Sequence, residues 1–199
     1  MSPVAALCLK EDNAAMATQP IADNLVSLEE YLSTCYEPDC EYDDGLIVER
    51  NVGEYDHSFL QTILGSMFTV NIDIWGVYGL TEQRIRIAPR KYRIPDVCVL
   101  RLDAPVDDIL NLPPLIAIEI LSPEDRWARV LIKASEYRDF GVENVWVIDP
   151  RRRKVFAATA GELREIEDGI FEVKGTPIRV QAGELFAKLD RMRARSRGV

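Results

Sequence analysis

Two carboxylates interrupt apolar strands in the middle of the chain, and this feature constrains the fold more than any other. The stretch from Ile94 to Pro150 has the pattern of a strand, a loop, a second strand, a helix and a third strand. Asp96 lies in IPDVCVL and Glu119 lies in LIAIEIL, at positions where a buried sheet carries apolar residues. Because an unpaired buried charge costs several kcal/mol, each acid needs a partner, a proton or a bound cation.

The connection between these strands predicts how the two acids are related in space. The loop from Arg101 to Pro114 is long enough to reverse the chain, so the two strands are expected to pair antiparallel. Asp96 is near the start of the first strand and Glu119 is near the end of the second. Antiparallel pairing therefore brings both acids to the same end of the sheet. Because side chains alternate along a strand, each acid shares its face of the strand with apolar side chains.

The residues that follow the second strand predict a helix and then a third strand. Ser122, Pro123 and Asp125 have the pattern of a helix N-terminus, and Gly141 is placed to end the helix. We expect its buried face to consist of Trp127, Val130, Leu131, Ala134 and Tyr137. Lys133 lies about 95° from the centre of that face at about 100° per residue, a flank from which it reaches over the sheet edge. NVWVID then continues parallel to LIAIEIL through a right-handed crossover.

Short helices and a hairpin precede this central unit. Ser27 and Glu30 form a capping box that opens a helix in SLEEYLSTC. Asp44 and Gly45 turn a hairpin whose arms are CEY and LIVER. The next helix, EYDHSFLQTILGSMFTV, has His57 on the first turn of its apolar face, where a lone histidine is most often a core or capping residue.

Further elements complete the chain on either side. IWGVYGL and EQRIRIAP predict two short strands before the central stretch. After it, KVFAAT, ELREIE, GIFEVKG and PIRV predict a β meander, and AGELFAKLDRMRARS predicts a closing helix. Residues 1–24 lack a sustained period, so we expect a mobile N-terminal arm there. Residues 25–199 are expected to form a single domain.

Charge and composition exclude several classes of protein. The formal net charge of -9 excludes a protein that binds nucleic acid mainly through bulk positive charge, although local contacts stay open. No apolar run approaches the roughly 20 residues that span a bilayer. The 4 cysteines have no CxxC spacing and only 1 histidine to join them, which favours reduced thiols over a zinc site or disulfides. We therefore expect a cytoplasmic protein.

A bound divalent cation would offset the free-energy cost of burying two neighbouring carboxylates. Carboxylate ligands without nitrogen or sulfur suit Mg²⁺ or Mn²⁺ better than zinc. Such an ion polarises a phosphodiester and lowers the pKa of a bound water, while the ammonium of Lys133 orients that water or stabilises developing charge. Asp96, Glu119 and Lys133 are thus the groups that phosphodiester hydrolysis needs.

The chain also resembles a known family. IPD, EILSPEDR, Lys133 and EYRDFGVENVWVIDP, in this order, are similar to the Uma family of restriction-endonuclease-like proteins, which belongs to the PD-(D/E)XK nuclease superfamily. The resemblance extends from SLEEYL to the C-terminal helix, with CEYDDG and DHSFLQTIL matching upstream segments of the family. It implies an α/β fold with a restriction-endonuclease-like core, in which helices flank a mixed central β-sheet and β-hairpins are added.

The resemblance implies a Mg²⁺-dependent DNA endonuclease, with Mn²⁺ as a second possible ion. Pro95-Asp96 corresponds to the PD element and Glu119 to the following acid, and the implied ligands are Asp96, Glu119 and the main-chain carbonyl of Ile120. The superfamily's usual lysine, two positions after the acid, is Leu121 here. The family's lysine on the next helix corresponds to Lys133, which would stand at the attacking water.

Four further residues match family positions around the cleft with less specific roles. Glu41 and His57 match positions near the cleft, and Ser122 and Tyr137 are expected behind the ligands. One departure concerns Leu46, because the family often has an acid after the DG turn. The resemblance therefore implies no role for Leu46.

The residues also allow readings without catalysis. Asp96 alone fits a strand-edge acid that Arg93 or a backbone N–H satisfies, and Glu119 with Lys133 fits a buried structural ion pair. A structural pair predicts that removing either partner costs about 3 to 5 kcal/mol. A catalytic site instead predicts that Lys133→Ala abolishes cleavage with little unfolding.

Three functions therefore stay open. The intact set of two acids and a lysine favours the endonuclease, expected as a homodimer because double-strand cutting needs two active sites. The acidic net charge favours a catalytically inactive nuclease-fold module that binds DNA or a protein partner. A metal-dependent hydrolase of another phosphoester is the third.

Overall fold

The computed structural model describes residues 25–51, 54–159 and 161–196, and the expected N-terminal arm over residues 1–24 lies outside this part of the chain. The helices are α1 Leu28–Ser33, α2 Tyr55–Val70, α3 Ile72–Trp75, α4 Trp127–Phe140 and α5 Ala182–Ser196. The first six strands are β1 Cys40–Asp43, β2 Leu46–Glu49, β3 Val77–Thr81, β4 Ile85–Ala88, β5 Lys91–Arg93 and β6 Val97–Arg101. The others are β7 Ile116–Ile120, β8 Asn144–Asp149, β9 Lys154–Thr159, β10 Glu162–Glu165, β11 Ile170–Glu172 and β12 Arg179–Gln181.

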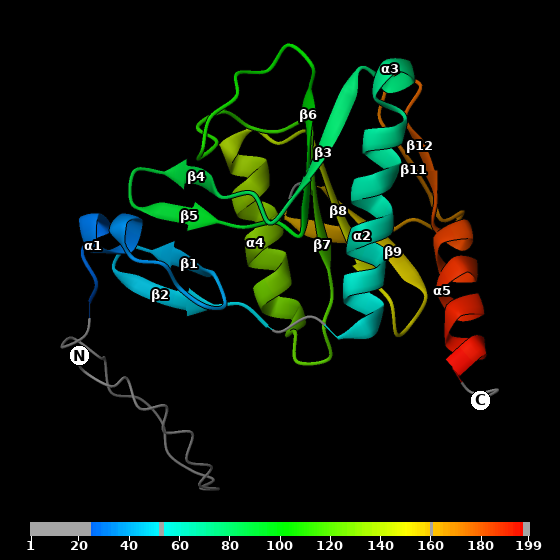
Figure 1. Cartoon of the computed structure of the whole chain (residues 1–199), viewed down its shortest axis with the longest axis horizontal. Helices are drawn as coiled ribbons and strands as arrows, with labels where there is room; N and C mark the ends of the chain where they lie inside the picture. Colours follow the sequence, from blue (N-terminus) through cyan, green and yellow to red (C-terminus); the bar gives the residue numbers. More distant parts are fainter. Residues whose placement is uncertain (1–24, 52–53, 160, 197–199) are drawn as a thin grey trace, which may run out of the picture.

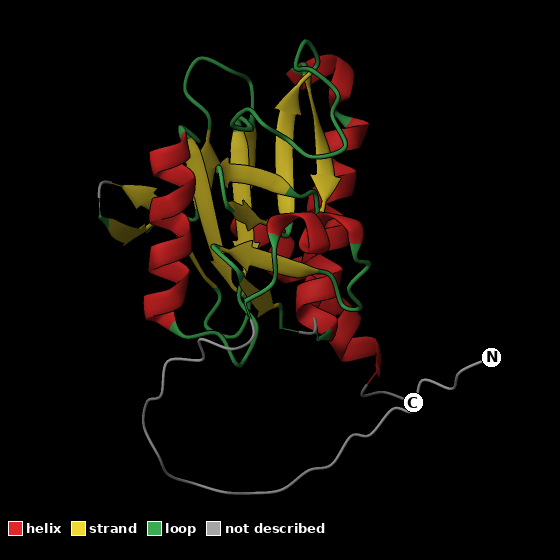
Figure 2. Cartoon of the chain, turned by 90° about the vertical axis from the view of Figure 1, so that its left-hand side faces the viewer, coloured by secondary structure: helices red, strands yellow, loops and turns green. Residues whose placement is uncertain are grey.

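A mixed six-stranded sheet forms the centre of the molecule, in the order β10-β9-β8-β7-β6-β3 (Figure 1). β6 and β7 pair antiparallel, and β7 and β8 pair parallel, as the sequence predicts. Helices lie on both sides of the strands in Figure 2. The α/β class, with a mixed central sheet between helices, is therefore confirmed.

The two faces of the central sheet have different cores because side chains alternate along β7. Ile116, Ile118 and Ile120 pack into the larger core, to which α2, α5 and the separate β11-β12 hairpin also contribute. Ala117 faces the other way, in a smaller core with Ala134 of α4. Glu119 follows Ala117 by two positions, so it also faces α4.

A four-stranded sheet, in the order β2-β1-β5-β4, lies beside the central sheet (Figure 1). The predicted hairpin is its β1-β2 half, with Asp44 at the turn in a left-handed conformation. β5 is a strand of this smaller sheet and not an extension of β6. The chain therefore passes from one sheet to the other at residues 94–96, which places Asp96 at the junction.

The start of α4 differs from the prediction. Ser122 does not cap the helix, which begins five residues later at Trp127 without a side-chain cap. Residues 122–125 form a turn instead, in which the N–H of Ser122 donates to Oδ2 of Asp125 at 2.6 Å and the N–H of Asp125 donates to the carbonyl of Ser122. Polar side chains near a helix start can bond local backbone groups in either arrangement.

The predicted buried face of α4 is correct for Val130, Ala134 and Tyr137 and wrong for Trp127. Trp127 is 41% exposed and packs edge-on against Phe156 of β9, with ring centroids 4.8 Å apart.

Two other segments also differ from the predictions. Residues 74–75 of the predicted strand IWGVYGL belong to α3, and Gly76 ends that helix with a φ of 65°, so β3 begins only at Val77. The predicted meander divides, because β9 and β10 join the central sheet while β11 and β12 pair separately. Within the described part of the chain, no helix is both long and apolar enough to cross a membrane.

Candidate functional site

Asp96 lies at the junction of the two sheets, with its carboxylate almost fully buried. Its Oδ1 is 2.9 Å from Nη2 of Arg50. Its Oδ2 accepts a hydrogen bond from the main-chain N–H of Ile120 at 2.7 Å and lies 3.1 Å from Nε2 of His57. The strand-pairing prediction is therefore correct in its main consequence, since Asp96 directly contacts the residue after Glu119.

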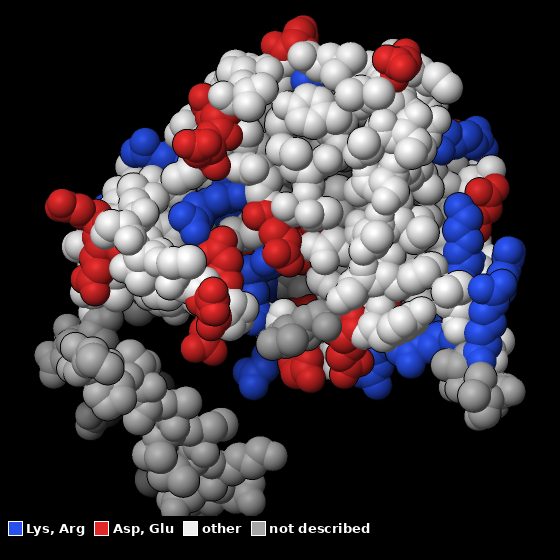
Figure 3. Space-filling view, in the orientation of Figure 1, with Lys and Arg blue, Asp and Glu red and all other residues white. Residues whose placement is uncertain are grey.

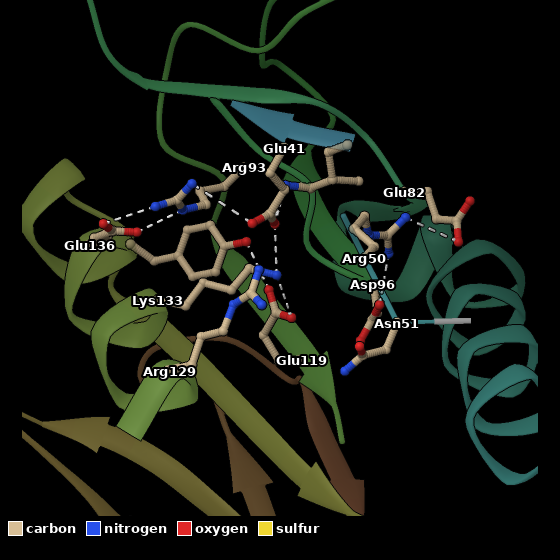
Figure 4. A network of polar contacts seen from close by, with 12 residues as sticks. Glu41, Arg50, Asn51, Glu82, Arg93, Asp96, Glu119, Arg129, Lys133 and Glu136 are labelled. Atoms are coloured by element: carbon tan, nitrogen blue, oxygen red, sulfur yellow. Dashed lines mark hydrogen bonds and ion pairs between the residues drawn. The ribbon is translucent and has the colours of Figure 1, made fainter. Parts of the chain in front are cut away.

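Glu119 and Glu41 hold Lys133 between them (Figure 4). The Nζ of Lys133 is 2.8 Å from Oε2 of Glu119 and 2.8 Å from Oε1 of Glu41. The hydroxyl of Tyr137 donates to Oε1 of Glu119 at 2.8 Å, and the N–H of Ile94 donates to Oε1 of Glu41 at 3.0 Å. Lys133 thus reaches across from α4 to strands of both sheets.

One pocket collects most of the residues that the sequence singles out. It is lined by side chains from both sheets, α2 and α4, among them Glu41, His57, Asp96, Glu119, Ile120, Ser122 and Lys133. Tyr137 is fully buried behind it. In Figure 3 acidic and basic side chains gather around this region and over the smaller sheet, while the surface over α2 shows few charges. The predicted set is thus brought together.

Arg50 lines the pocket and contacts Asp96, a contact that the sequence does not predict. The sequence offers Arg93 as a partner of Asp96, but Arg93 bonds Glu136 of α4 at 2.7 Å and Asp43 at 2.8 Å. Arg50, at the end of the predicted LIVER arm, takes the place beside Asp96. No local pattern marks this contact, because the two residues are 46 positions apart.

The smaller sheet is fastened to α4 by a second group of ion pairs. Glu136 contacts both Arg93 and Lys91 of β5 at 2.7 Å. Arg93 also lies 3.8 Å from Glu41, the partner of Lys133, so this network fixes β5 and β1 against the helix and joins the contacts of Lys133. It therefore sets the position of Glu41 relative to Lys133.

The electrostatics of the acids differ although they share a pocket. Burial raises the pKa of Glu119 to about 7, and Lys133 opposes that rise only in part. For Asp96, burial also favours the protonated form, but the hydrogen bond and charge of His57 outweigh it and lower the pKa. Burial alone would lower the pKa of His57, and Asp96 reverses this and raises it. Asp96 and His57 therefore stabilise each other's charged forms, whereas Glu119 retains a proton near neutrality.

The oxygen atoms of the pocket suit a divalent cation in kind. Asp96 and Glu119 offer carboxylates and Ile120 offers a main-chain carbonyl, which are ligands that Mg²⁺ and Mn²⁺ prefer. The high pKa of Glu119 indicates buried negative charge that a cation would relieve. Among the described residues, no group of three or more His, Cys, Asp or Glu side chains is arranged to hold an ion, and the ligand set that the sequence predicts contains only two carboxylates. The chemical type of these donors is therefore the one that such an ion takes.

Above the pKa of Glu119, which burial raises to about 7, Tyr137→Phe is expected to lower the free energy of unfolding by about 2 kcal/mol, because it leaves a buried, charged acceptor without its donor. Tyr31→Phe is the matched control, since its buried hydroxyl donates to the neutral carbonyl of Cys40 at 2.9 Å. We expect a loss of about 1 kcal/mol there. Urea unfolding of both variants checks this, and an equal or smaller loss for Tyr137→Phe would contradict the role assigned to its hydroxyl.

Comparisons with known proteins agree with this fold. The family model Uma2, described as "Putative restriction endonuclease", matches residues 28–181. A crystal structure from Anabaena variabilis, described as "a putative nuclease belonging to DUF820", is similar with a TM-score of 0.70 and 22% sequence identity, and the match covers 81% of this chain and 98% of that one. At this identity the likeness shows a shared fold. No curated protein matches the chain.

Proposed function

The chain belongs to the Uma2 family of restriction-endonuclease-like proteins, as its sequence motifs predict, and on that basis we propose that it is a Mg²⁺-dependent DNA endonuclease. The observation that carries the proposal is the meeting of Asp96, Glu119 and Lys133 in one pocket, from two antiparallel strands and the following helix. Ion pairs between the same residues would also form in a purely structural cluster. The proposal therefore needs a test of chemistry.

In the proposed mechanism each side chain has a limited task. Asp96, Glu119 and the carbonyl of Ile120 would hold the ion, which supplies polarisation of the phosphodiester and a more acidic water. His57 and the N–H of Ile120 keep Asp96 ionised and fixed in place.

Lys133 supplies the positive charge that the reaction needs. Its ammonium is positioned by Glu41 and Glu119, and it orients the attacking water and stabilises negative charge on the phosphoryl oxygens. Tyr137 keeps Glu119 from rotating away by bonding its second oxygen. Glu41 thus acts by positioning Lys133, whereas the resemblance to the family places it only near the cleft.

Conversion of supercoiled plasmid to nicked or linear DNA tests the activity. The protein is expected to nick plasmid with Mg²⁺ or Mn²⁺ and to lose at least about a hundredfold of this rate as Asp96→Ala. EDTA should stop the reaction. Nicking that persists in Asp96→Ala or in EDTA would show that the cleavage comes from a contaminant or another site.

Crystals soaked in Mn²⁺ test the ion's place independently of activity. The anomalous signal is expected between Asp96 and Glu119, within reach of the carbonyl of Ile120. A peak elsewhere in the molecule would refute this ligand set.

A catalytically inactive module that binds DNA or a protein is the second candidate. The observation that favours it is that every carboxylate oxygen of Asp96 and Glu119 already contacts a donor within the chain. The net charge of -9 also gives little general attraction for DNA. DNA binding without nicking, at equal affinity in wild type and Asp96→Ala, would favour this candidate.

DNA as substrate, a homodimer and a cytoplasmic location are part of the proposal. Double-strand cutting by a single-site subunit needs two copies, so we expect a dimer by light scattering on a sizing column. A monomer that nicks only one strand would refute the expected dimer but would still support the nuclease activity.

A further inference from the structure

The connection after β2 places an arginine on the acid that the proposed ion needs. We propose that Arg50 is an internal cation that occupies Asp96 while no divalent ion is bound, and that it must move onto Glu82 before the ion can bind. This inference rests on the proposed metal site at Asp96 and Glu119. It concerns when that site becomes available.

Asp96 has three donors, and they differ in their freedom to move. The N–H of Ile120 belongs to the backbone of the central sheet, and His57 is buried in the first turn of α2. Both contact Oδ2. Arg50 alone contacts Oδ1 among the side chains described, and it lies beyond the end of β2 in the connection to α2. Arg50 is therefore the donor that can leave without disrupting the sheet or the helix.

Glu82 offers Arg50 a second carboxylate. Nη1 of Arg50 is 3.4 Å from Oε1 of Glu82, while Nη2 is 2.9 Å from Asp96, so one guanidinium spans both acids (Figure 4). The side chain of Glu82 is 53% exposed and that of Asp96 only 7%. A guanidinium that gives up Asp96 can keep its other acid at the solvent boundary and need not become an unpaired charge.

Arg50 and a divalent ion compete because both are cations and both need the same carboxylate. An arginine side chain stays protonated throughout the working pH range, so it cannot remove the conflict by losing a proton. Lys133 contacts the other proposed carboxylate ligand, Glu119, together with Glu41, and does not contact Asp96. Among the described side chains, the position of Arg50 thus decides whether Oδ1 of Asp96 is free.

The test is the affinity for Mn²⁺, measured by titration calorimetry on the full chain without DNA. Arg50→Gln is expected to bind Mn²⁺ about tenfold more tightly, because the ion no longer displaces a charge-assisted hydrogen bond. Arg129→Gln is the matched control. Arg129 lines the same pocket but contacts the carbonyl of Glu49, so its loss is expected to change the affinity by less than about twofold.

A double-mutant cycle separates displacement onto Glu82 from a general effect of charge. Glu82→Gln is expected to weaken Mn²⁺ binding in the wild type and to have no effect in the Arg50→Gln background. Equal weakening in both backgrounds, or equal gains for Arg50→Gln and Arg129→Gln, would overturn the inference. Mn²⁺ binding that Asp96→Asn abolishes but Arg50→Gln leaves unchanged would overturn it while the metal site stands. Mn²⁺ binding that Asp96→Asn does not affect would refute both the inference about Arg50 and the proposed metal site.

A wild-type crystal soaked in Mn²⁺ gives a second readout that does not depend on the folding of Arg50→Gln. With the ion bound, we expect Arg50 to contact Glu82 and to lie beyond hydrogen-bond distance from Oδ1 of Asp96. An ion on Asp96 with Arg50 still in place would overturn the inference.

Discussion

Lys133→Ala is expected to lose plasmid nicking by at least about a hundredfold and to lose about 3 kcal/mol of unfolding free energy in the absence of metal. The loss of activity follows from the missing positive charge at the attacking water. The loss of stability follows because Glu41 and Glu119, both buried, share this one ammonium. Nicking assays and urea unfolding measure the two effects on the same sample.

Lys91→Ala is the control for the stability effect. Lys91 also contacts two carboxylates, Glu136 and Asp43, but its side chain is 28% exposed against 17% for Lys133, and Arg93 remains to pair with Glu136. Its loss is expected to cost about 1 kcal/mol or less and to leave nicking unchanged. A nicking rate at wild-type level in folded Lys133→Ala would reject Lys133 as a catalytic residue.

The contacts of Lys133 change which measurement can distinguish a structural ion pair from a catalytic lysine. The sequence alone presents them as alternatives, one with a large loss of stability and the other with little. The structure places Lys133 in a buried pair with two acids, so a loss of stability is expected under either reading. Only activity and ion binding, measured on folded protein, distinguish them.

The stability of the wild type is expected to fall as the pH rises from about 5 to 8 without metal. The folded chain holds a proton on Glu119 up to about pH 7, whereas the unfolded chain releases it near 4.5. Since the folded state binds more protons in this window, unfolding becomes easier with rising pH, by an amount on the order of 3 kcal/mol. The raised pKa of His57 acts in the same direction, because the stability from its charged form is lost as the pH rises through that pKa.

Urea unfolding of Glu119→Gln across the same range checks the assignment. This variant has no carboxyl to titrate, so its stability is expected to depend much less on pH. Glu162→Gln is the control, because Arg164 lowers the pKa of this exposed carboxylate and its titration ends below the window. A slope that Glu119→Gln leaves intact would place the titrating group elsewhere.

Local patterns predict a large part of the central unit. The DG turn of the first hairpin, the antiparallel pairing of the two acid-bearing strands and the parallel third strand all follow from spacing and side-chain type, and the structure has them. The start of α4 is less predictable. Ser122 and Asp125 suit both a helix cap and a local turn, and nothing within a few residues chooses between them.

The sequence by itself determined the order of strands and helix in the central unit and the acids that this unit carries. The periodicity of apolar residues, the turn residues and the helix-end signals all act between residues that are near neighbours in the chain. It also determined that Asp96 and Glu119 had to be near each other, since one strand pairing relates them. Lys133 was already indicated as a partner of Glu119, but only the tertiary structure decided the other charges that surround the two acids. Glu41, Arg50 and His57 come from the smaller sheet, the connection after β2 and α2, and their contacts depend on how these elements pack against the central sheet. The cost of burying charge requires partners for the acids, but packing selects them.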